Sequence, residues 1–413
     1  MTLSVSHKAH DEFDQATLPG VVVIVVGFHN AADIVSCLRA LSRARRGPRF
    51  DVFISENGGP EAVAALLDAL LGPASPCRQL RDGRNFIGRS PALADVRFSL
   101  PREDSGNDAI VRVAQMPENL GYAGGINAWL RLLRDLPGWQ AVWILNPDTE
   151  PTPTALFELA SHASKHKRGM VGSRIVSAVW PDGARTCGLS RRKITSRTVA
   201  VNHAVLAAFA SDPDNVEAQL DAPDGASIYV TRSLIERIGL MDERYFLYYE
   251  DLEWRFRAKK LKQLGYAHRS VVPHKGGTTI GSSPSRAGRS RLAVYMEFRN
   301  RIVFARHRHG AWLAWAILMQ VAHIATYLFA GSLSNMVAAG RGTLAGLRGE
   351  TGNPAHVLRV HAAQFAESLP LTAFQGSRTA LWFRGSRHAE KEPAFWADLA
   401  RSLVQASLYF NFI

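Results

Sequence analysis

The feature that most constrains the fold is an unbroken run of β-branched residues near the N-terminus, Val21 to Val26, which ends at Gly27. A strand that is apolar on both faces is typical of the centre of a parallel sheet with helices on either side. Residues 30–44 follow with the apolar spacing of an amphipathic helix. The same alternation continues, with strands predicted at 51–55, 110–114 and 141–145, a helix at 61–71 and another after Gly125. The chain is therefore predicted to form a doubly wound α/β structure.

Two carboxylates follow predicted strands. Glu56 comes after strand 51–55, and Asp148 comes after strand 141–145 in the sequence Asn146-Pro147-Asp148. Ligands of open α/β sheets bind beyond the carboxyl ends of the strands, so both are candidate site residues. Asp148 becomes a metal ligand only with further donors, and His274 is a candidate; a capping role for Asp148 and a structural role for His274 remain open.

Glu250 and Asp251 form an adjacent acidic pair after the aromatic run of residues 245–249. A carboxylate in a partly apolar wall at a helix N-terminus is suited to act as a general base. The alternative is that Asp251 caps the helix while Glu250 and Glu253 face solvent.

Residues 119–127 form a glycine-rich turn before a helix, which lets backbone amides approach phosphate or ribose oxygens. The run lacks the Walker pattern and the dinucleotide fingerprint, and a simple tight turn explains it equally well. Two segments show no regular pattern. Residues 72–108 are rich in Pro, Gly, Arg and Asp and are predicted to be a surface excursion, and residues 191–221 give no clear pattern.

The C-terminal part is basic and then apolar. Residues 286–308 hold seven arginines against the single acid Glu297, and residues 311–340 carry no charge apart from histidine. Polar residues make that stretch a poor membrane span, and an arginine flank beside Trp and Leu suits a helix lying among lipid headgroups. A buried helical hairpin is the alternative.

The net charge of +13 suits polyanionic partners such as nucleotide diphosphates or anionic lipids. Three separated cysteines predict neither a disulfide framework nor a zinc site, and with a polar N-terminus they favour a cytoplasmic location. Nucleic-acid binding is not expected, because the arginines adjoin an apolar helix and no aromatic stacking platform.

Taken together, these segments resemble family 2 glycosyltransferases with the A-type fold, and most of all bacterial rhamnosyltransferase-like enzymes that build cell-surface polysaccharide. The resemblance covers residues 20–281, and residues 341–349 resemble the segment after the membrane-proximal helices of those enzymes. It is carried by Phe28-His29-Asn30, Glu56-Asn57-Gly58, residues 119–127, Asn146-Pro147-Asp148, Gly225-Ala226-Ser227, Glu250-Asp251 and His274-Lys275-Gly276-Gly277.

The resemblance implies a role for each matching residue. Asp148 would hold Mg²⁺ or Mn²⁺ on the diphosphate with His274 as a further ligand, and Asp251, beside Glu250, would be the catalytic base. Glu56 stands where the family has an Asp that reads the base. The remaining residues implied in nucleotide-sugar binding are Phe28, Asn30, Asn57, Asn119, Gly121, Gly124, Asn127, Asn146, Gly225 and Ala226.

The function implied is inverting transfer of a sugar, possibly rhamnose, from a nucleotide-diphospho-sugar to a lipid-linked or polysaccharide acceptor in cell-surface glycan synthesis. A base deprotonates the acceptor hydroxyl while the cation stabilises the departing diphosphate. Two alternatives stay open: a nucleotidyltransferase in which Asp148 and Asp251 bind two metals, and a non-catalytic membrane-associated binding module.

The resemblance also implies a division of the chain and a location. We expect a polar tail at 1–19, the A-type catalytic domain at 20–281, a basic and aromatic helical region at 282–350 that associates with the membrane, and an extension of unknown role at 351–413. The protein is expected to be cytoplasmic, attached peripherally to the inner face of the plasma membrane.

Overall fold

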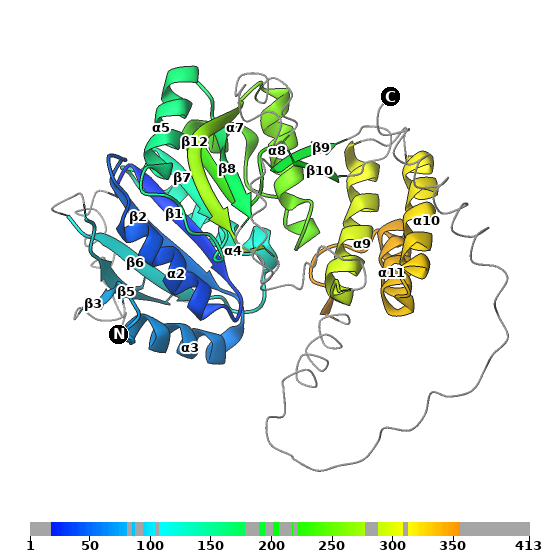
Figure 1. The fold of residues 1–413 in the computed structure, drawn as a ribbon, viewed down its shortest axis with the longest axis horizontal. Helices are drawn as coiled ribbons and strands as arrows, with labels where there is room; N and C mark the ends of the chain where they lie inside the picture. Colours follow the sequence, from blue (N-terminus) through cyan, green and yellow to red (C-terminus); the bar gives the residue numbers. More distant parts are fainter. Residues whose placement is uncertain are drawn as a thin grey trace, which may run out of the picture. The chain divides into compact units, whose positions relative to one another are not determined.

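The structure is a computed structural model, and Figure 1 shows its fold. It describes residues 18–80, 85–86, 94–103, 107–177, 190–194, 201–205, 217, 222–276, 288–308 and 313–355. These residues all belong to one compact unit, Met1–Ala363. The predicted tail at 1–19 and extension at 351–413 therefore lie almost wholly outside the described residues.

The centre of the molecule is a mixed ten-stranded sheet with the strand order β12-β8-β11-β7-β1-β2-β6-β5-β3, and β4 pairs with β5 off this path. Strands β7, β1, β2 and β6 run parallel, whereas β11 is antiparallel to both β7 and β8. The strands are β1 Val21–Gly27, β2 Phe50–Glu56, β3 Arg78–Gln79, β4 Asn85–Phe86, β5 Ala94–Leu100, β6 Ala109–Gln115, β7 Ala141–Leu145, β8 Met170–Ser177, β11 Ser227–Thr231 and β12 Leu264–His274. A separate pair is β9 Ser190–Ile194 with β10 Val201–Val205.

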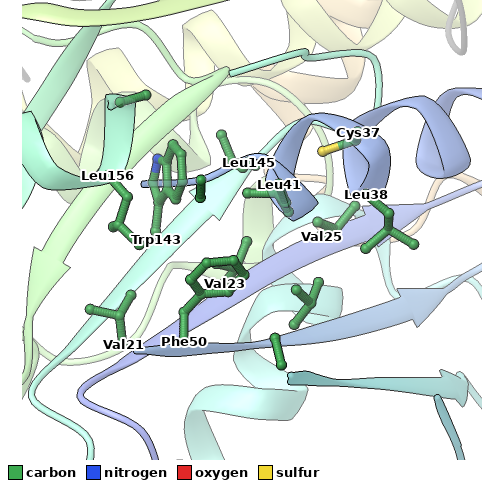
Figure 2. Close-up of a cluster of buried hydrophobic side chains, with 14 of the residues drawn as sticks. Val21, Val23, Val25, Cys37, Leu38, Leu41, Phe50, Trp143, Leu145 and Leu156 are labelled. Carbon is green, nitrogen blue, oxygen red and sulfur yellow. The ribbon is translucent and has the colours of Figure 1, made fainter. Parts of the chain in front are cut away.

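Helices cover both faces of this sheet (Figure 1). They explain why β1 is apolar throughout: Val21, Val23 and Val25 belong to one hydrophobic cluster, and Val22 and Ile24 to another. Figure 2 shows the first cluster, in which β1 packs with residues of β2, β7 and two helices. The helices are α2 Ala31–Ser42, α3 Gly59–Leu71, α4 Gly121–Arg134, α5 Ala155–His166, α7 Arg232–Ile238 and α8 Glu250–Lys260, with a 3-10 turn η2 at Glu243–Tyr245.

The surface excursion predicted for residues 72–108 is wrong in part. Strand β5 lies within it and pairs antiparallel with β6. Apolar and polar residues alternate along its second half: Phe98 and Leu100 are fully buried, whereas Arg97 is half-buried. This two-residue period indicates a strand, but the surrounding Pro, Gly and Arg residues obscure it.

Three helices follow the sheet: α9 Arg291–Arg308, α10 Leu313–Phe329 and α11 Leu333–Arg348. Helices α9 and α11 approach closely. A Cβ on Gly346 of α11 would lie only 2.6 Å from the carbonyl oxygen of Arg299 on α9. Within the described residues, no helix has the length and apolar character that crossing a membrane requires. The uncharged stretch thus forms two helices that meet near Gly331, as in the hairpin alternative, although several of its apolar side chains are exposed.

The arginines of α9 do not all form the lipid-facing flank that the sequence suggested. Arg299 and Arg301 are 1% and 5% exposed. Just before the helix, Arg289 pairs with Glu297 through Nη2 and Oε2 at 2.5 Å. Arg301 donates to the other carboxylate oxygen of Glu297 at 2.8 Å. Charge counting alone could not separate these interior arginines from solvated ones, because burial of an arginine depends on its partners.

Candidate functional site

The carboxyl ends of β1, β2 and β7 form one edge of the sheet, since these strands are parallel neighbours. Glu56 lies at this edge and is 1% exposed. Its Oε1 accepts hydrogen bonds from the backbone N–H groups of Gly58 at 2.8 Å and His29 at 3.3 Å. Its Oε2 is buried and has no hydrogen-bond partner among the described residues. Burial raises the pKa of the Glu56 carboxyl, although these two N–H groups oppose the rise.

Two asparagines fix the backbone beside Glu56. Asn30 accepts a hydrogen bond from the N–H of Phe28 at 3.0 Å, which sets the turn between β1 and α2. Asn57 donates to the carbonyl oxygen of Gly121 at 3.0 Å and accepts from the N–H of Leu120 at 3.3 Å. The polar residues after β1 and β2 are thus joined to the glycine-rich turn.

The glycine-rich turn opens α4 at Gly121, about one helical turn earlier than the sequence indicated. Asn119 accepts from the N–H of Gly121 at 3.0 Å. Gly121 has a φ of +71°, and a Cβ there would collide with the carbonyl oxygen of Phe246, so this position requires glycine. Gly124 is buried against Leu120.

Asn127 lies deeper, on α4. It is 1% exposed; its amide donates to the carbonyl of Met241 at 2.9 Å and to Glu243 at 2.7 Å, and its oxygen accepts from the N–H of Met241 at 3.1 Å. These bonds hold α4 against the segment after α7. A donor-binding role for Asn127 stays a prediction.

Asp148 lies just beyond the tip of β7 and contacts His274 at the end of β12. Its Oδ1 is 3.1 Å from the Nε2 of His274, and its Oδ2 accepts from the N–H of Gly276 at 3.1 Å. A backbone bridge between Thr149 and His274 fixes the two segments together. Asp148 and His274 are far apart in the sequence, so the sequence does not reveal their contact. The order of the strands in the sheet brings them together.

The carboxylate of Asp148 suits Mg²⁺ or Mn²⁺, which prefer oxygen ligands, and the imidazole of His274 could add a nitrogen ligand, which Mn²⁺ accepts more readily than Mg²⁺. Among the described residues, no group of three or more His, Cys, Asp or Glu side chains could enclose a metal ion. A cation held by Asp148 and His274 would take its other ligands from a bound diphosphate and water, as Mg²⁺ commonly does.

Glu250 and Asp251 begin α8 and are 3% and 5% exposed. The capping alternative is wrong: the N-cap residue is Tyr249 with no side-chain capping bond, and Glu253 is 1% exposed. Asp251 forms a buried ion pair with Arg255, one helical turn later. A Cβ on Gly225 would lie 2.5 Å from the Oδ2 of Asp251, so the absence of a side chain at Gly225 makes room for the carboxylate.

Tyr122 joins the segment after β7 to the segment before β11. Its hydroxyl lies 3.0 Å from the Oδ1 of Asn146 and 3.3 Å from the carbonyl oxygen of Gly225. Burial and then the negative charge of Glu250 raise the pKa of the Tyr122 phenol, and Asp148 adds to the rise. The buried Tyr122 hydroxyl is thus within range of the charges of both Glu250 and Asp148.

Gly225 and Ala226 complete this side. The carbonyl of Ala226 accepts from the N–H of Asn146 at 3.0 Å, and the N–H of Ala226 donates to Asp224 at 2.9 Å.

Tyr122 and Arg255 are site residues that the sequence patterns did not single out. Tyr122 lies inside the glycine-rich run, and Arg255 lies four residues after Asp251. Residues four apart on a helix are neighbours, so the spacing of Asp251 and Arg255 is the one signal of their contact.

No protein-family profile matches the chain. The chain is 28% identical over 291 residues, 64% of its length and 88% of the relative's, to an N-acetylglucosaminyl-diphospho-decaprenol L-rhamnosyltransferase of Mycobacterium tuberculosis. It is 24% identical over 244 residues, 57% of its length and 75% of the relative's, to the low-salt glycan biosynthesis hexosyltransferase Agl10 of Haloferax volcanii.

Among solved structures, the mannosyltransferase PcManGT of Pyrobaculum calidifontis, in complex with GDP-Man and Mn²⁺, aligns with 86% of this chain over 82% of its own. Its sequence identity is 15% and its TM-score 0.41. The chain is thus similar in sequence to two glycosyltransferases over more than half of its length. Its homology to the rhamnosyltransferase and the hexosyltransferase is distant.

Proposed function

We propose that this protein is an inverting glycosyltransferase that moves a sugar from a nucleotide-diphospho-sugar to a lipid-linked or polysaccharide acceptor. The observation that carries the proposal is the Tyr122 hydroxyl, which contacts Asn146 near Asp148 and Gly225 beside Asp251. A cation on the leaving diphosphate and a base for the acceptor must act on the same anomeric carbon, and this arrangement supports one shared site.

On the donor side, Glu56 would read the base, because its buried Oε2 is an acceptor that a base N–H can satisfy. Asp148 and His274 would hold Mg²⁺ or Mn²⁺, which stabilises negative charge on the departing diphosphate when bound. The other donor contacts would come from Phe28, Asn30, Asn57, Asn119, Gly121, Gly124, Asn127, Asn146, Gly225 and Ala226.

On the acceptor side, Asp251 would take the proton of the attacking hydroxyl, with Glu250 beside it. The ion pair with Arg255 fixes the direction of the Asp251 carboxylate. The same pair argues against the nucleotidyltransferase alternative, since a guanidinium on Asp251 competes with a second metal ion.

A purified-protein assay tests the reaction class. A panel of nucleotide sugars is incubated with Mn²⁺, and the released nucleotide is identified. Release of a nucleoside diphosphate supports glycosyl transfer, and release of pyrophosphate from a nucleoside triphosphate would support the nucleotidyltransferase instead. Rhamnose as the donor sugar is the expectation suggested by the named activity of the mycobacterial relative.

We also propose that the protein attaches to the inner face of the plasma membrane. Of the large apolar side chains exposed among the described residues, most lie on α10 and α11, and Arg341 and Arg348 are exposed on α11. Apolar side chains flanked by arginines suit an anionic bilayer surface. The exposed apolar residues on these two helices are Leu318, Val321, Leu328, Phe329, Leu333, Val337, Leu344 and Leu347.

Flotation with phosphatidylethanolamine and phosphatidylglycerol vesicles tests this placement. Replacing Leu328 and Phe329 by Ser should reduce the floated fraction, whereas replacing the exposed Leu71 of α3 by Ser should not. Equal flotation of both variants, or none for the unmodified protein, would contradict membrane attachment through this face.

A further inference from the structure

The turn that leads into α8 has a strained backbone. Phe246, Tyr248 and Tyr249 have φ values of +62°, +66° and +74°, in the left-handed region that bulky side chains rarely adopt. Such conformations persist only where surrounding contacts hold them. Residues 245–249, which we call the aromatic turn, lie directly before Glu250 and Asp251 and therefore set the position of the backbone that carries both carboxylates.

One side chain of α9, Asn300, contacts three backbone carbonyl groups of this turn. The Nδ2 of Asn300 lies 2.8 Å from the carbonyl oxygen of Tyr245, 2.7 Å from that of Leu247 and 2.8 Å from that of Tyr248. Asn300 is fully buried. Its Oδ1 accepts from the Nε of Arg299 at 3.0 Å, which fixes the orientation of the amide.

The neighbours of Asn300 hold the two ends of the turn. Arg299 donates from Nη2 to the carbonyl of Tyr245 at 3.1 Å. Arg301 donates from Nε to the hydroxyl of Tyr249 at 3.1 Å. Three consecutive residues of α9 thus contact the aromatic turn, although 52 to 55 residues separate the bonded partners in sequence.

Helix α11 fixes α9 in turn. A Cβ on Gly342 would collide with the carbonyl oxygen of Tyr295, and one on Gly346 would lie 2.6 Å from the carbonyl oxygen of Arg299. Both glycines belong to residues 341–349. Their small size lets the helices approach closely, which places Asn300 at hydrogen-bonding distance from the turn.

We propose that Asn300 is a positioning residue that holds the aromatic turn so that Glu250 and Asp251 point into the site; this rests on the proposed function. Asn300 does not contact the reacting atoms in this arrangement. Its loss should therefore lower the rate of transfer and leave donor binding intact. A misplacement of about 1 Å can lower a rate by about 100-fold.

The test compares Asn300→Ala with Asn335→Ala as a matched control. Asn335 is also buried, but its amide donates to the carbonyl of Arg289 at 2.9 Å, which is not a residue of the aromatic turn. For each variant, kcat, the donor KM and amide hydrogen exchange of residues 245–252 are measured. Asn300→Ala should lower kcat by about 100-fold, change the donor KM by less than about twofold and speed exchange in this segment.

A third variant, Asn300→Asp, separates positioning from general packing. Its carboxylate repels the three carbonyl oxygens, but protonation restores a donor, so its kcat should recover relative to the unmodified protein as the pH falls. A purely structural role predicts no such recovery.

The proposal is overturned if Asn300→Ala keeps normal kcat and normal exchange, or if Asn335→Ala changes both to the same degree. Absence of transfer by the unmodified protein with every donor would instead contradict the proposed function. The exchange comparison still decides in that case whether Asn300 holds the turn.

Discussion

The sheet edge at Glu56 and the start of α8 are held in different ways. At the edge, Glu56 is fixed by the N–H groups of His29 and Gly58. At the start of α8, the backbone before Glu250 is fixed by Asn300, which is 52 residues from Tyr248. The carboxylate of Glu56 is therefore fixed by turns at the ends of β1 and β2, whereas the backbone before the proposed catalytic acids is fixed by a helix that follows later in the chain.

The strongest response is expected at the start of α8. Asp251→Asn keeps the size of the side chain but removes its basicity, so kcat should fall by about 10³-fold, within the usual range for loss of a general base. Isothermal titration should show donor affinity within about twofold of the unmodified protein. Normal turnover by purified Asp251→Asn protein would refute the base assignment, and Glu250→Gln then tests the neighbouring acid.

At the sheet edge, in contrast, substitution of Asp148 is expected to lower donor affinity. Asp148→Ala removes the carboxylate that contacts His274, and donor affinity in Mn²⁺ should fall by at least about 10- to 100-fold, the loss typical of residues that only orient a metal ligand. Titrations with and without Mn²⁺ measure it. Affinity that is equally metal-dependent in the variant would contradict the metal assignment.

Tyr122→Phe should have a weaker effect, because its hydroxyl joins the two regions without taking part in the chemistry. Loss of one buried hydrogen bond costs about 1 kcal/mol, which corresponds to a fall in kcat/KM of roughly fivefold. Steady-state kinetics measure this change. A loss as large as that of Asp251→Asn would mean that Tyr122 takes part in the chemistry directly.

The smallest expected change is in thermal stability, on substitution of Glu56. Burial raises the pKa of Glu56 above its usual value, so the folded protein binds this proton more tightly than the unfolded chain does. Ionised Glu56 thus opposes folding at neutral pH, and the cost disappears as the pH falls below about 4.5. Without donor, Glu56→Gln should raise Tm by about 2 °C at pH 7 and by less at pH 4.

The exposed Glu61 of α3 provides the control for this measurement. Glu61→Gln removes an acid of the first helical turn and should leave Tm unchanged or slightly lower at pH 7. If Glu56→Gln lowers Tm at neutral pH, the inference that ionised Glu56 opposes folding is wrong.

Much of the sheet could be predicted from sequence because it follows from local patterns. The run Val21 to Val26 predicts a central strand, and β1 is buried on both faces between two clusters. Strand β5 was not predicted, because its short alternation of apolar and polar residues lies among turn-forming residues. The antiparallel direction of β11 depends on its pairing with β7 and β8, which no local pattern of Ser227–Thr231 reveals.

Some residues of the candidate site can likewise be recognised from local sequence patterns, and others cannot. Glu56, Asp148 and Asp251 are recognisable because each follows a strand or opens a helix. Tyr122 and Asn300 are not, because their roles come from contacts across 24 and 52 residues of sequence. Arg299 and Arg301 are likewise indistinguishable in sequence from a surface flank, although they are interior residues.

The decisive measurement is a crystal structure with a nucleoside diphosphate and Mn²⁺, in which anomalous scattering locates the metal. We predict that Mn²⁺ lies against the carboxylate of Asp148 and that the diphosphate end of the nucleotide faces Asp251 across the Tyr122 hydroxyl. Metal and nucleotide bound in a place from which Asp251 is shielded would contradict the proposal of one shared site.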